Sequence, residues 1–339
     1  MVDSKTSADF IVSAFYHFCS IKSPSELRKH LLQQVKRFNM KGTILVANEG
    51  INGTIAGTRP DTDQFFMQLR ADDRFDALQT KESYTAEAPF LRAKVKVKEE
   101  IVTLGQPDLD PENQAGTHVR PEDWNALISD PDVILVDTRN DYEVAIGSFE
   151  GAQNPHTQSF REFPDYAEHQ LAHHKDKKIA MFCTGGIRCE KSTALLKSQG
   201  FKEVYHLEGG ILNYFEKVPA SESRWQGACF VFDERVAVNQ DLKPAGFVQC
   251  HACRRPLTPD DLMLESYEPG LSCRYCIETV TDHQRARFAE RQKQSRLAKQ
   301  GGEAHLGDAA RSAQAARKAA KYEARHQRTT EARTTKDKS

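Results

Sequence analysis

The sequence lacks any apolar run long enough to cross a membrane. Its most apolar early stretch, residues 10–18, is interrupted by Ser13 and His17 and is far shorter than the roughly 20 residues that a spanning helix needs. A secretory signal is also missing, because no basic segment followed by an apolar stretch and a small-residue cleavage site opens the chain. We therefore expect no membrane association and place the protein in the cytoplasm.

Cysteine is scarce for a chain of 339 residues. There are 8 cysteines, and four of them form two CxxC pairs. A disulfide scaffold is typical of short secreted domains, whereas paired cysteines in a long chain without a signal indicate metal or thiol chemistry. The cysteine content thus favours a reducing compartment.

Residues 281–339 have few large apolar side chains. The only ones are Phe288, Leu297, Leu306 and Tyr322, too few to bury a core, so we expect a disordered tail or a solvated helix. This stretch holds 15 Lys and Arg against 7 Asp and Glu, whereas the rest of the chain holds 32 against 41. A basic tail on an acidic body suggests an anionic partner such as nucleic acid, but a tail that merely keeps the protein soluble explains the charge equally well.

Length and composition indicate a soluble protein of several domains. The chain is 39% hydrophobic and 28% charged, which is typical of globular proteins, and its length exceeds that of one ordinary core. We divide it into an N-terminal domain (8–98), a linker (99–121), a central domain (122–217), a cysteine module (218–280) and the basic tail (281–339).

The N-terminal domain reads as strand, helix, hairpin, helix and strand. The corresponding ranges are 10–18, 24–38, 43–47 with 51–56, 61–69 and 93–97. This order suits a ferredoxin-like α+β fold. The linker that follows is poor in regular signals and rich in proline and glycine.

The central domain alternates apolar strands with helices. We predict strands over 133–136, 179–182 and 204–207, with helices over 121–128 and 190–199. Fully apolar strands between helices are typical of a parallel, doubly wound α/β sheet. Residues 218–280 read as a loop-rich module that holds the paired cysteines.

A cysteine loop follows the second of these strands. It comprises Cys183, Thr184, Gly185, Gly186, Ile187 and Arg188. The glycines allow a tight turn between strand and helix, where backbone N–H groups and the helix N-terminus favour an anion. Such surroundings, together with the Arg188 cation, lower a cysteine pKa from its ordinary value of about 8.5. We expect a reactive thiolate at Cys183; the alternative, a buried inert thiol, suits this position less well.

Several residues near the loop call for structural roles. Cys189, in the first helical turn, could resolve an oxidised Cys183, but a packed helix cysteine is favoured. Asp137 and Arg139 are expected to form an ion pair that braces the loop. Gly209 and Gly210 suit a turn that needs positive φ.

The paired cysteines predict a metal site. Cys250 and Cys253 are separated from Cys273 and Cys276 by 19 residues, a spacing typical of a closed tetrahedral Cys₄ zinc site of structural role. Reduced free thiols or two disulfides remain as alternatives. His251 could be a spare ligand, although an exposed loop histidine is favoured. The neighbouring Arg254, Arg255 and Arg274 would suit a module that faces nucleic acid.

The loop, read with Asp137-Thr-Arg139 and Leu207-Glu-Gly-Gly210, resembles the rhodanese superfamily. The resemblance implies that Cys183 is the nucleophile and forms a persulfide intermediate. The six-residue loop from Cys183 to Arg188 has the length of sulfurtransferase-type members. Dual-specificity phosphatases use a loop one residue longer, which makes a phosphatase the least favoured alternative.

A second motif, Gly42-Thr-Ile-Leu-Val-Ala-Asn-Glu-Gly-Ile-Asn-Gly-Thr-Ile-Ala-Gly57, precedes the loop and the CxxC pairs. This combination, over about residues 8–280, closely resembles the bacterial tRNA uridine(34) hydroxylase family. The resemblance implies conversion of the wobble uridine of tRNA to 5-hydroxyuridine, with molecular oxygen as co-substrate. The basic tail lies outside the shared pattern, and the sequence shows no flavin, haem or iron motif that would activate oxygen.

Two mechanisms and two other functions stay open at this point. Cys183 could attack C6 of uracil while loop amides hold the O4 anion, or it could carry oxygen as a sulfenic acid. A persulfide sulfurtransferase that serves a thiol or sulfur-relay partner would share Cys183, and a non-enzymatic RNA-binding module would use the zinc site and tail.

Contacts to tRNA are less clearly marked in the sequence. Lys94, Lys96 and Lys98 could bind phosphates or guard an edge strand. Glu49 and Asn52 read as ordinary turn residues without a catalytic role.

Overall fold

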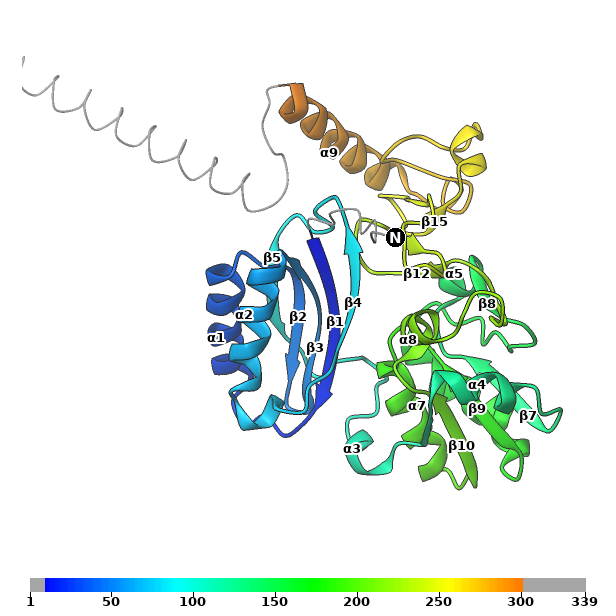
Figure 1. Ribbon diagram of the computed structural model, residues 1–339. Helices are drawn as coiled ribbons and strands as arrows, with labels where there is room; N and C mark the ends of the chain where they lie inside the picture. The colour runs from blue at the N-terminus through cyan, green and yellow to red at the C-terminus, as the bar shows by residue number, and fades with distance from the viewer. Residues whose placement is uncertain (1–9, 301–339) are drawn as a thin grey trace, which may run out of the picture.

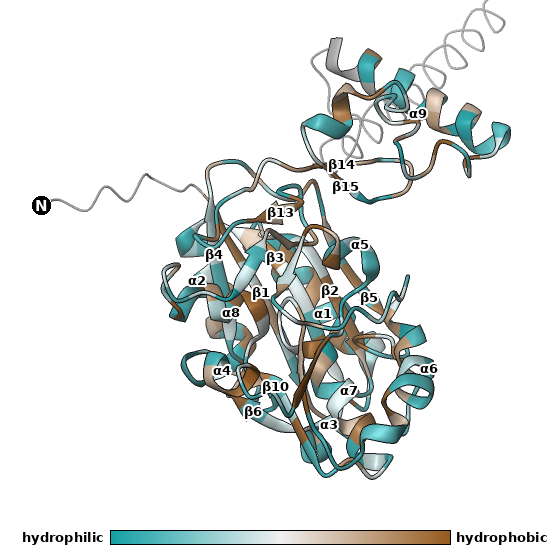
Figure 2. Ribbon diagram, turned by 90° about the vertical axis from the view of Figure 1, so that its right-hand side faces the viewer, coloured by the Kyte–Doolittle hydropathy of each residue, from teal (hydrophilic) through white to brown (hydrophobic). Residues whose placement is uncertain are grey.

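The computed structural model describes residues 10–300, which form two α/β domains and a small cysteine module that continues into helix α9 (Asp282–Gln300). The sheet of the N-terminal domain carries helices on its outer face and turns its other face towards the central domain (Figure 1). Residues 248–280 of the cysteine module, which hold the paired cysteines, and helix α9 stand apart from both domains (Figure 2). The preceding residues 225–238 of the module instead pack against the two domains. No helix among residues 10–300 is long and apolar enough to span a membrane.

The N-terminal domain has the ferredoxin-like fold that its sequence predicts. It comprises β1 (Phe10–Phe18), α1 (Pro24–Arg37), β2 (Lys41–Ala47), β3 (Gly50–Gly57), α2 (Arg59–Arg70), β4 (Thr80–Thr85) and β5 (Ala93–Val97). The sheet order is β4-β1-β3-β2-β5.

The expected strand over residues 93–97 is confirmed as β5, but the sequence analysis missed one strand of this domain, β4. The expected last strand, β5, does not take the fourth position of the fold, because β4 fills it beside β1. Strand β5 is an addition at the opposite edge, parallel to β2. The sequence of β4, Thr-Lys-Glu-Ser-Tyr-Thr, is almost wholly polar and carries no alternation of apolar side chains that would reveal a strand.

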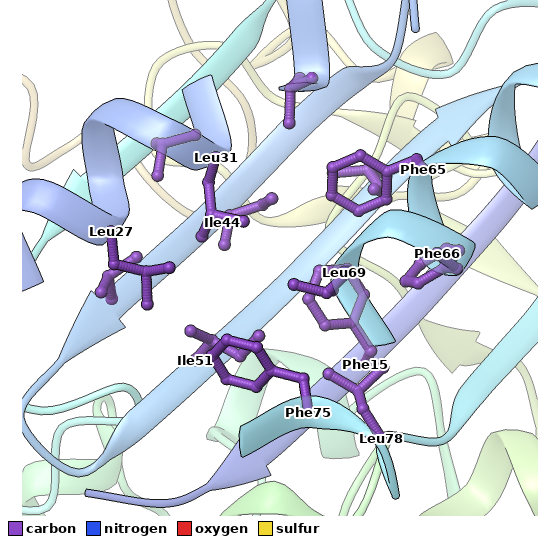
Figure 3. Packing of buried hydrophobic residues seen from close by; sticks show 14 of the residues in the cluster. Phe15, Leu27, Leu31, Ile44, Ile51, Phe65, Phe66, Leu69, Phe75 and Leu78 are labelled. Atoms are coloured by element: carbon purple, nitrogen blue, oxygen red, sulfur yellow. The ribbon is translucent and has the colours of Figure 1, made fainter. Parts of the chain in front are cut away.

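The core of the N-terminal domain lies between the sheet and its two helices (Figure 3). Leu27 and Leu31 of α1 pack there, and Phe66 of α2 meets Phe15 of β1 in an edge-to-face contact with ring centroids 5.3 Å apart. Because side chains alternate along a strand, the neighbours Ala14 and Tyr16 belong to the other face, which is left free to build a site.

The central domain is the expected parallel, doubly wound α/β unit. Its main elements are α4 (Pro121–Ile128), β7 (Val133–Asp137), β9 (Lys178–Phe182), α7 (Ile187–Ser198), β10 (Glu203–Leu207) and α8 (Gly210–Lys217). The sheet order is β6-β10-β9-β7, with all pairs parallel. The three apolar strands that the sequence predicts are confirmed.

The stretch expected to be a linker is partly ordered structure. It contains the short helix α3 (Pro111–Gln114) and strand β6 (Thr117–Val119), which pairs with β10. Ile101 and Leu104 of the same stretch are buried. A three-residue strand is too short to show a periodic pattern, so only its pairing with β10 identifies it.

The remaining elements are short. They are α5 (Asp141–Val144), β8 (Gly147–Phe149), α6 (Phe163–Tyr166), β11 (Trp225–Gly227), β12 (Cys229–Phe230), β13 (Ala237–Val238), β14 (Val248–Gln249) and β15 (Pro256–Leu257). The start of the basic tail forms helix α9, in agreement with the second of its two expected forms, a disordered segment or a solvated helix. Residues 301–339 of the tail lie outside the described residues.

Candidate active site

Strand β9 ends just before Cys183, and Cys183 begins a tight loop that leads into helix α7. The Cys183 side chain is buried, and the backbone N–H of Gly186 donates a hydrogen bond to its Sγ at 3.1 Å. Gly186 has a φ of +101°, which a residue with a side chain rarely adopts. Thr184, Gly185, Ile187 and Arg188 of the loop line a cavity, and a side chain at Gly185 would point into open space.

Backbone hydrogen bonds from the first turn of α8 fix the position of the cysteine loop. The N–H groups of Ile211 and Leu212 donate to the carbonyl oxygens of Cys183 and Thr184 at 3.0 and 3.1 Å. The backbones approach so closely that a Cβ on Gly210 would lie 2.4 Å from the Cys183 carbonyl oxygen. The positive φ expected for Gly209 and Gly210 is confirmed at +72° and +68°.

Arg188 is a buried cation whose charge is already compensated. Its two terminal nitrogens donate to the carboxylate of Glu143 at 2.7 and 2.8 Å, and one of them reaches Thr184 Oγ1 at 3.3 Å. The sequence analysis did not identify Glu143 as a residue of the site. Its one signal was the capping-box spacing from Asn140 to Glu143, which predicts a helix start and not an ion pair with a distant arginine.

The surroundings of Cys183 favour the thiolate. Burial alone would raise its pKa, but the Cys189 thiol, the Arg188 guanidinium and the backbone N–H groups of residues 188 and 189 together lower the pKa of Cys183 to about 5. Burial and the neighbouring Cys183 raise the pKa of Cys189 well above its ordinary value. Cys189 is therefore a packed thiol beside a thiolate, with its Sγ also 3.6 Å from Thr138 Oγ1.

Asp137 and Arg139 form the expected ion pair, at 2.6 Å and fully buried. Arg139 also donates to the Gly147 carbonyl and lies over the Trp225 ring at 4.9 Å. The pair therefore joins β7 to the β8–β11 ribbon. Its support of the loop is indirect, through Thr138, whose N–H donates to the Phe182 carbonyl at 3.0 Å.

The loop opens into a cavity of about 540 Å³ between the two domains. Alternate residues of β1 form one wall, including Val12, Ala14 and Tyr16. Lys98, Glu100 and Ile101–Thr103 form another, and a third comes from Val231–Asp233 and Arg235 of the cysteine module. The site is thus built by four parts of the chain that the sequence analysis treated as separate units.

Two residues of the N-terminal sheet stand close to the cysteine loop. The Tyr16 hydroxyl donates to Glu190 Oε1 of α7 at 2.8 Å, and a Cβ on Gly186 would lie 2.9 Å from that hydroxyl. The Lys81 ammonium lies 5.1 Å from the centroid of the Tyr16 ring. Burial lowers the pKa of Lys81, while the charges of Cys183 and Glu190 oppose this effect. No sequence signal marked either residue.

The N-terminal motif and the cysteine loop motif meet in the structure. Lys191, fully buried on α7, forms ion pairs of 2.7 Å with Glu49 and with Glu100. Glu49 also accepts from the Ile101 N–H at 2.6 Å, and Asn52 donates to the Ile101 carbonyl at 2.8 Å. The interpretation of Glu49 and Asn52 as ordinary turn residues was incomplete, because Glu49 joins the N-terminal domain to α7 and Asn52 joins it to the stretch after β5.

The four paired cysteines converge as their spacing predicts. Their Sγ atoms all lie within 4.8 Å of one another, and Cys273 is 3.7 Å from both Cys253 and Cys276. Four thiolates at about 2.3 Å from a tetrahedral zinc ion would be about 3.8 Å apart, so the cluster could bind a metal. The cysteines are free, which disfavours the disulfide alternative.

Of the basic residues expected to contact RNA, Lys96, Lys98, Arg254 and Arg274 are exposed, whereas Lys94 and Arg255 are half-buried. His251 is exposed and outside the cysteine cluster. The guanidinium groups of Arg255 and Arg274 lie 5.2 and 5.4 Å from the Tyr275 ring centroid. Lys96 and Lys98 are exposed at or just after the edge strand β5, and Lys98 also lines the cavity.

Two family models match separate parts of the chain. Residues 10–101 match the family model described as the UPF0176 acylphosphatase like domain, and residues 120–217 match the rhodanese-like domain.

Solved structures similar to this chain include three rhodanese-like proteins. A rhodanese-like domain from Anabaena has 20% identity, covering 32% of this chain and 78% of that one, with a TM-score of 0.28. A rhodanese-related protein from Thermoplasma volcanium has 21% identity over 30% and 93%, with a TM-score of 0.25. A rhodanese-like domain protein from Staphylococcus aureus has 24% identity over 29% and 90%, with a TM-score of 0.25.

The chain therefore carries an acylphosphatase-like N-terminal domain followed by a rhodanese-like domain. Its loop cysteine supports sulfurtransferase-type or related chemistry.

Proposed function

We propose that this protein is a tRNA-modifying enzyme of the cytoplasm that hydroxylates the wobble uridine at C5, with Cys183 as nucleophile and molecular oxygen as co-substrate. The observation that carries the proposal is the position of Cys183 at a cavity of about 540 Å³ between two domains. This volume is in the range of pockets that bury whole small molecules and accommodates an extruded nucleotide. Transfer of sulfur to a small anion such as cyanide needs no such space.

The cavity offers the chemical groups that recognise a base in a single-stranded loop. Phe232 lines the cavity with 60% of its surface exposed, which leaves an aromatic face for stacking. Lys81 and Lys98 line the same cavity, and no carboxylate lies within ion-pair distance of Lys81 in the part of the chain that the structure describes. Lys81 can therefore meet the anionic O4 or a phosphate of the substrate.

The chemistry can start with attack of the Cys183 thiolate on C6 of uracil, which moves the C5=C6 electron pair towards O4. The loop amides and Lys81 stabilise this oxyanion. The oxygen donor is a peroxide, that is, O₂ reduced with two protons by two electrons from a thiol reductant. C5 attacks the peroxide, hydroxide leaves, and loss of the C5 proton with expulsion of the thiolate yields 5-hydroxyuridine.

A second route uses the same residues. The peroxide first oxidises the Cys183 thiolate to a sulfenic acid, which passes its hydroxyl group to C5 and returns as a thiol. A covalent adduct between Cys183 and tRNA supports the first route, whereas a sulfenic acid trapped by a dimedone probe before tRNA is added supports the second.

The cysteine module and the tail complete the proposal. A zinc ion held by Cys250, Cys253, Cys273 and Cys276 would stabilise the module, which contributes Phe232 and Arg235 to the cavity. The basic tail would contact tRNA phosphates, and this contact would weaken as salt is raised.

The test is nucleoside mass spectrometry of tRNA from a strain that lacks the gene, complemented with wild type, Cys183→Ala or Cys19→Ala. Cys19 belongs to the N-terminal domain and does not line the cavity, so it is a matched control. We expect 5-hydroxyuridine derivatives with wild type and Cys19→Ala only. If the deletion leaves these nucleosides unchanged while the protein turns over thiosulfate and cyanide rapidly, sulfur transfer replaces this proposal.

A further inference from the structure

A second cluster of polar side chains lies at the edge of the central sheet, on its α7 side. His118 of β6 and His206 of β10 are direct partners in the parallel register, so their side chains project from the same face of the sheet. Their ring centroids are 4.1 Å apart. Helix α7 places Glu190 against both rings.

The three side chains have the spacing of ligands to one ion. His118 Nε2 is 3.0 Å from Glu190 Oε1, and His206 Nε2 is 3.5 Å from Glu190 Oε2. A metal with bonds of about 2.1 Å separates neighbouring ligand atoms by about 3.0 Å at right angles and about 3.4 Å in a tetrahedron. Both distances fall close to this range.

His206 supplies an independent sign of a missing partner. The residue is 0% exposed, and its Nδ1 makes no hydrogen bond within the described residues. Its Nε2 makes no hydrogen bond there either, and only the Glu190 carboxylate faces it, at 3.5 Å. Buried polar groups without a partner are rare and call for an explanation such as a bound ion. His118 is 47% exposed, so an ion can enter from solvent and keep open coordination positions.

The cluster also has a supporting residue from the other domain. The Tyr16 hydroxyl donates to Glu190 Oε1 at 2.8 Å, as groups behind a metal ligand commonly do to orient it. Because Tyr16 also lines the cavity beside Cys183, the cluster is joined to the proposed active site through one side chain.

We propose that His118, Glu190 and His206 bind a divalent first-row transition-metal ion, with Fe²⁺ as the preferred occupant. Two imidazoles and one carboxylate with open positions form the donor set of non-haem iron sites that handle oxygen. The paired cysteines offer sulfur only and are closed, so the chain would hold two metals of different kinds. This site stands on its own residues and does not depend on the proposed reaction.

The experiment uses Co²⁺ as a spectroscopic probe on the metal-free full chain, followed by anaerobic Fe²⁺ titration. Cobalt on nitrogen and oxygen ligands lacks the strong sulfur charge-transfer absorption of cobalt on thiolates, so the two sites are told apart. We expect wild type to bind one ion more per chain than His118→Ala or His206→Ala, with the sulfur bands unchanged. His174→Ala, on an exposed histidine, should bind as wild type does.

Tyr16→Phe should weaken this binding by roughly 10- to 100-fold without abolishing it. Should His206→Ala fail to fold, His118→Ala decides alone, because its side chain is half exposed. Equal metal content and equal spectra in wild type and folded His118→Ala would overturn the proposal. Loss of tRNA hydroxylation has no bearing on this result, since metal binding is measured without tRNA.

Discussion

The cysteine loop and the cysteine module use sulfur in opposite ways. Cys183 stands alone in a preformed, buried loop, where backbone amides and neighbouring side chains lower its pKa to about 5. The module brings four cysteines together around a small cluster that includes Leu257 as its one fully buried aliphatic residue. In the loop, the folded structure stabilises the thiolate form of Cys183. In the module, a metal ion bound by the four thiolates would stabilise the folded structure.

Removal of the metal should affect only one of these regions, and strongly. Structural zinc contributes roughly 10–16 kcal/mol to the folding of small zinc modules. We therefore expect Cys250→Ser with Cys253→Ser, or chelation, to abolish hydrogen-exchange protection in residues 248–280 while β9 and β10 stay protected. Simultaneous loss of protection in the central domain would show that the module is not an independent unit.

The loop should instead be sensitive to the loss of one buried charge. Glu143→Gln removes the partner of the buried Arg188, and breaking a buried pair on one side costs about 3–5 kcal/mol. Urea unfolding should show this loss of unfolding free energy. The control is Glu150→Gln, whose exposed pair with Arg224 at 3.7 Å should contribute less than about 1 kcal/mol. Equal effects of the two variants would contradict the structural account of the loop.

Binding of RNA should separate the cavity from the surface around the four paired cysteines. Phe232→Ala removes the exposed aromatic face at the cavity, and loss of one base–aromatic stack costs about 1–3 kcal/mol. Affinity for an anticodon stem-loop should therefore fall by roughly 10- to 100-fold. Arg274→Ala on the module surface should have a smaller, salt-dependent effect. The reverse order would place the main contact beside the paired cysteines.

Protonation of the Cys183 thiolate at low pH should have the smallest effect of the four changes, and this effect should be confined to the loop. With its pKa lowered to about 5, Cys183 is ionised at neutral pH and loses its charge only as pH falls through about 5. Stability gained from this thiolate is fully present above the ordinary thiol pKa, falls progressively as the pH drops from there, and is lost as the pH passes through about 5.

The measurement is the ultraviolet thiolate absorbance of wild type minus that of Cys183→Ser. Arg188→Lys keeps the charge but loses the forked geometry, so the midpoint should rise less than in Arg188→Gln. Cys229, whose pKa burial raises to about 12, should contribute nothing below pH 9 or so. A midpoint that stays near the ordinary thiol value in wild type would contradict the geometry of the loop.

Local sequence predicted the parts of the site that lie close together in the chain. The apolar strand before Cys183 and the Gly185-Gly186 turn indicated the loop, and the CxxC spacing indicated the metal cluster. Apolar runs also revealed the three main strands of the central sheet, because a buried parallel strand must be apolar on both faces. Polar or very short strands such as β4 and β6 were not predicted, since they carry no such apolar pattern.

What the sequence by itself determined is therefore the loop that holds Cys183 and the cluster of four cysteines, because each depends on residues only a few positions apart or on a fixed spacing. Only the tertiary structure decided that Glu143 neutralises Arg188, that Lys191 joins Glu49 to Glu100, and that Tyr16 reaches Glu190 across 174 positions of the chain. Glu143 and Arg188 meet inside the central domain, whereas Lys191 with Glu49 and Tyr16 with Glu190 meet where the two domains bury polar groups against each other. Buried charges need partners, and the docking of the two domains determines which residues supply them.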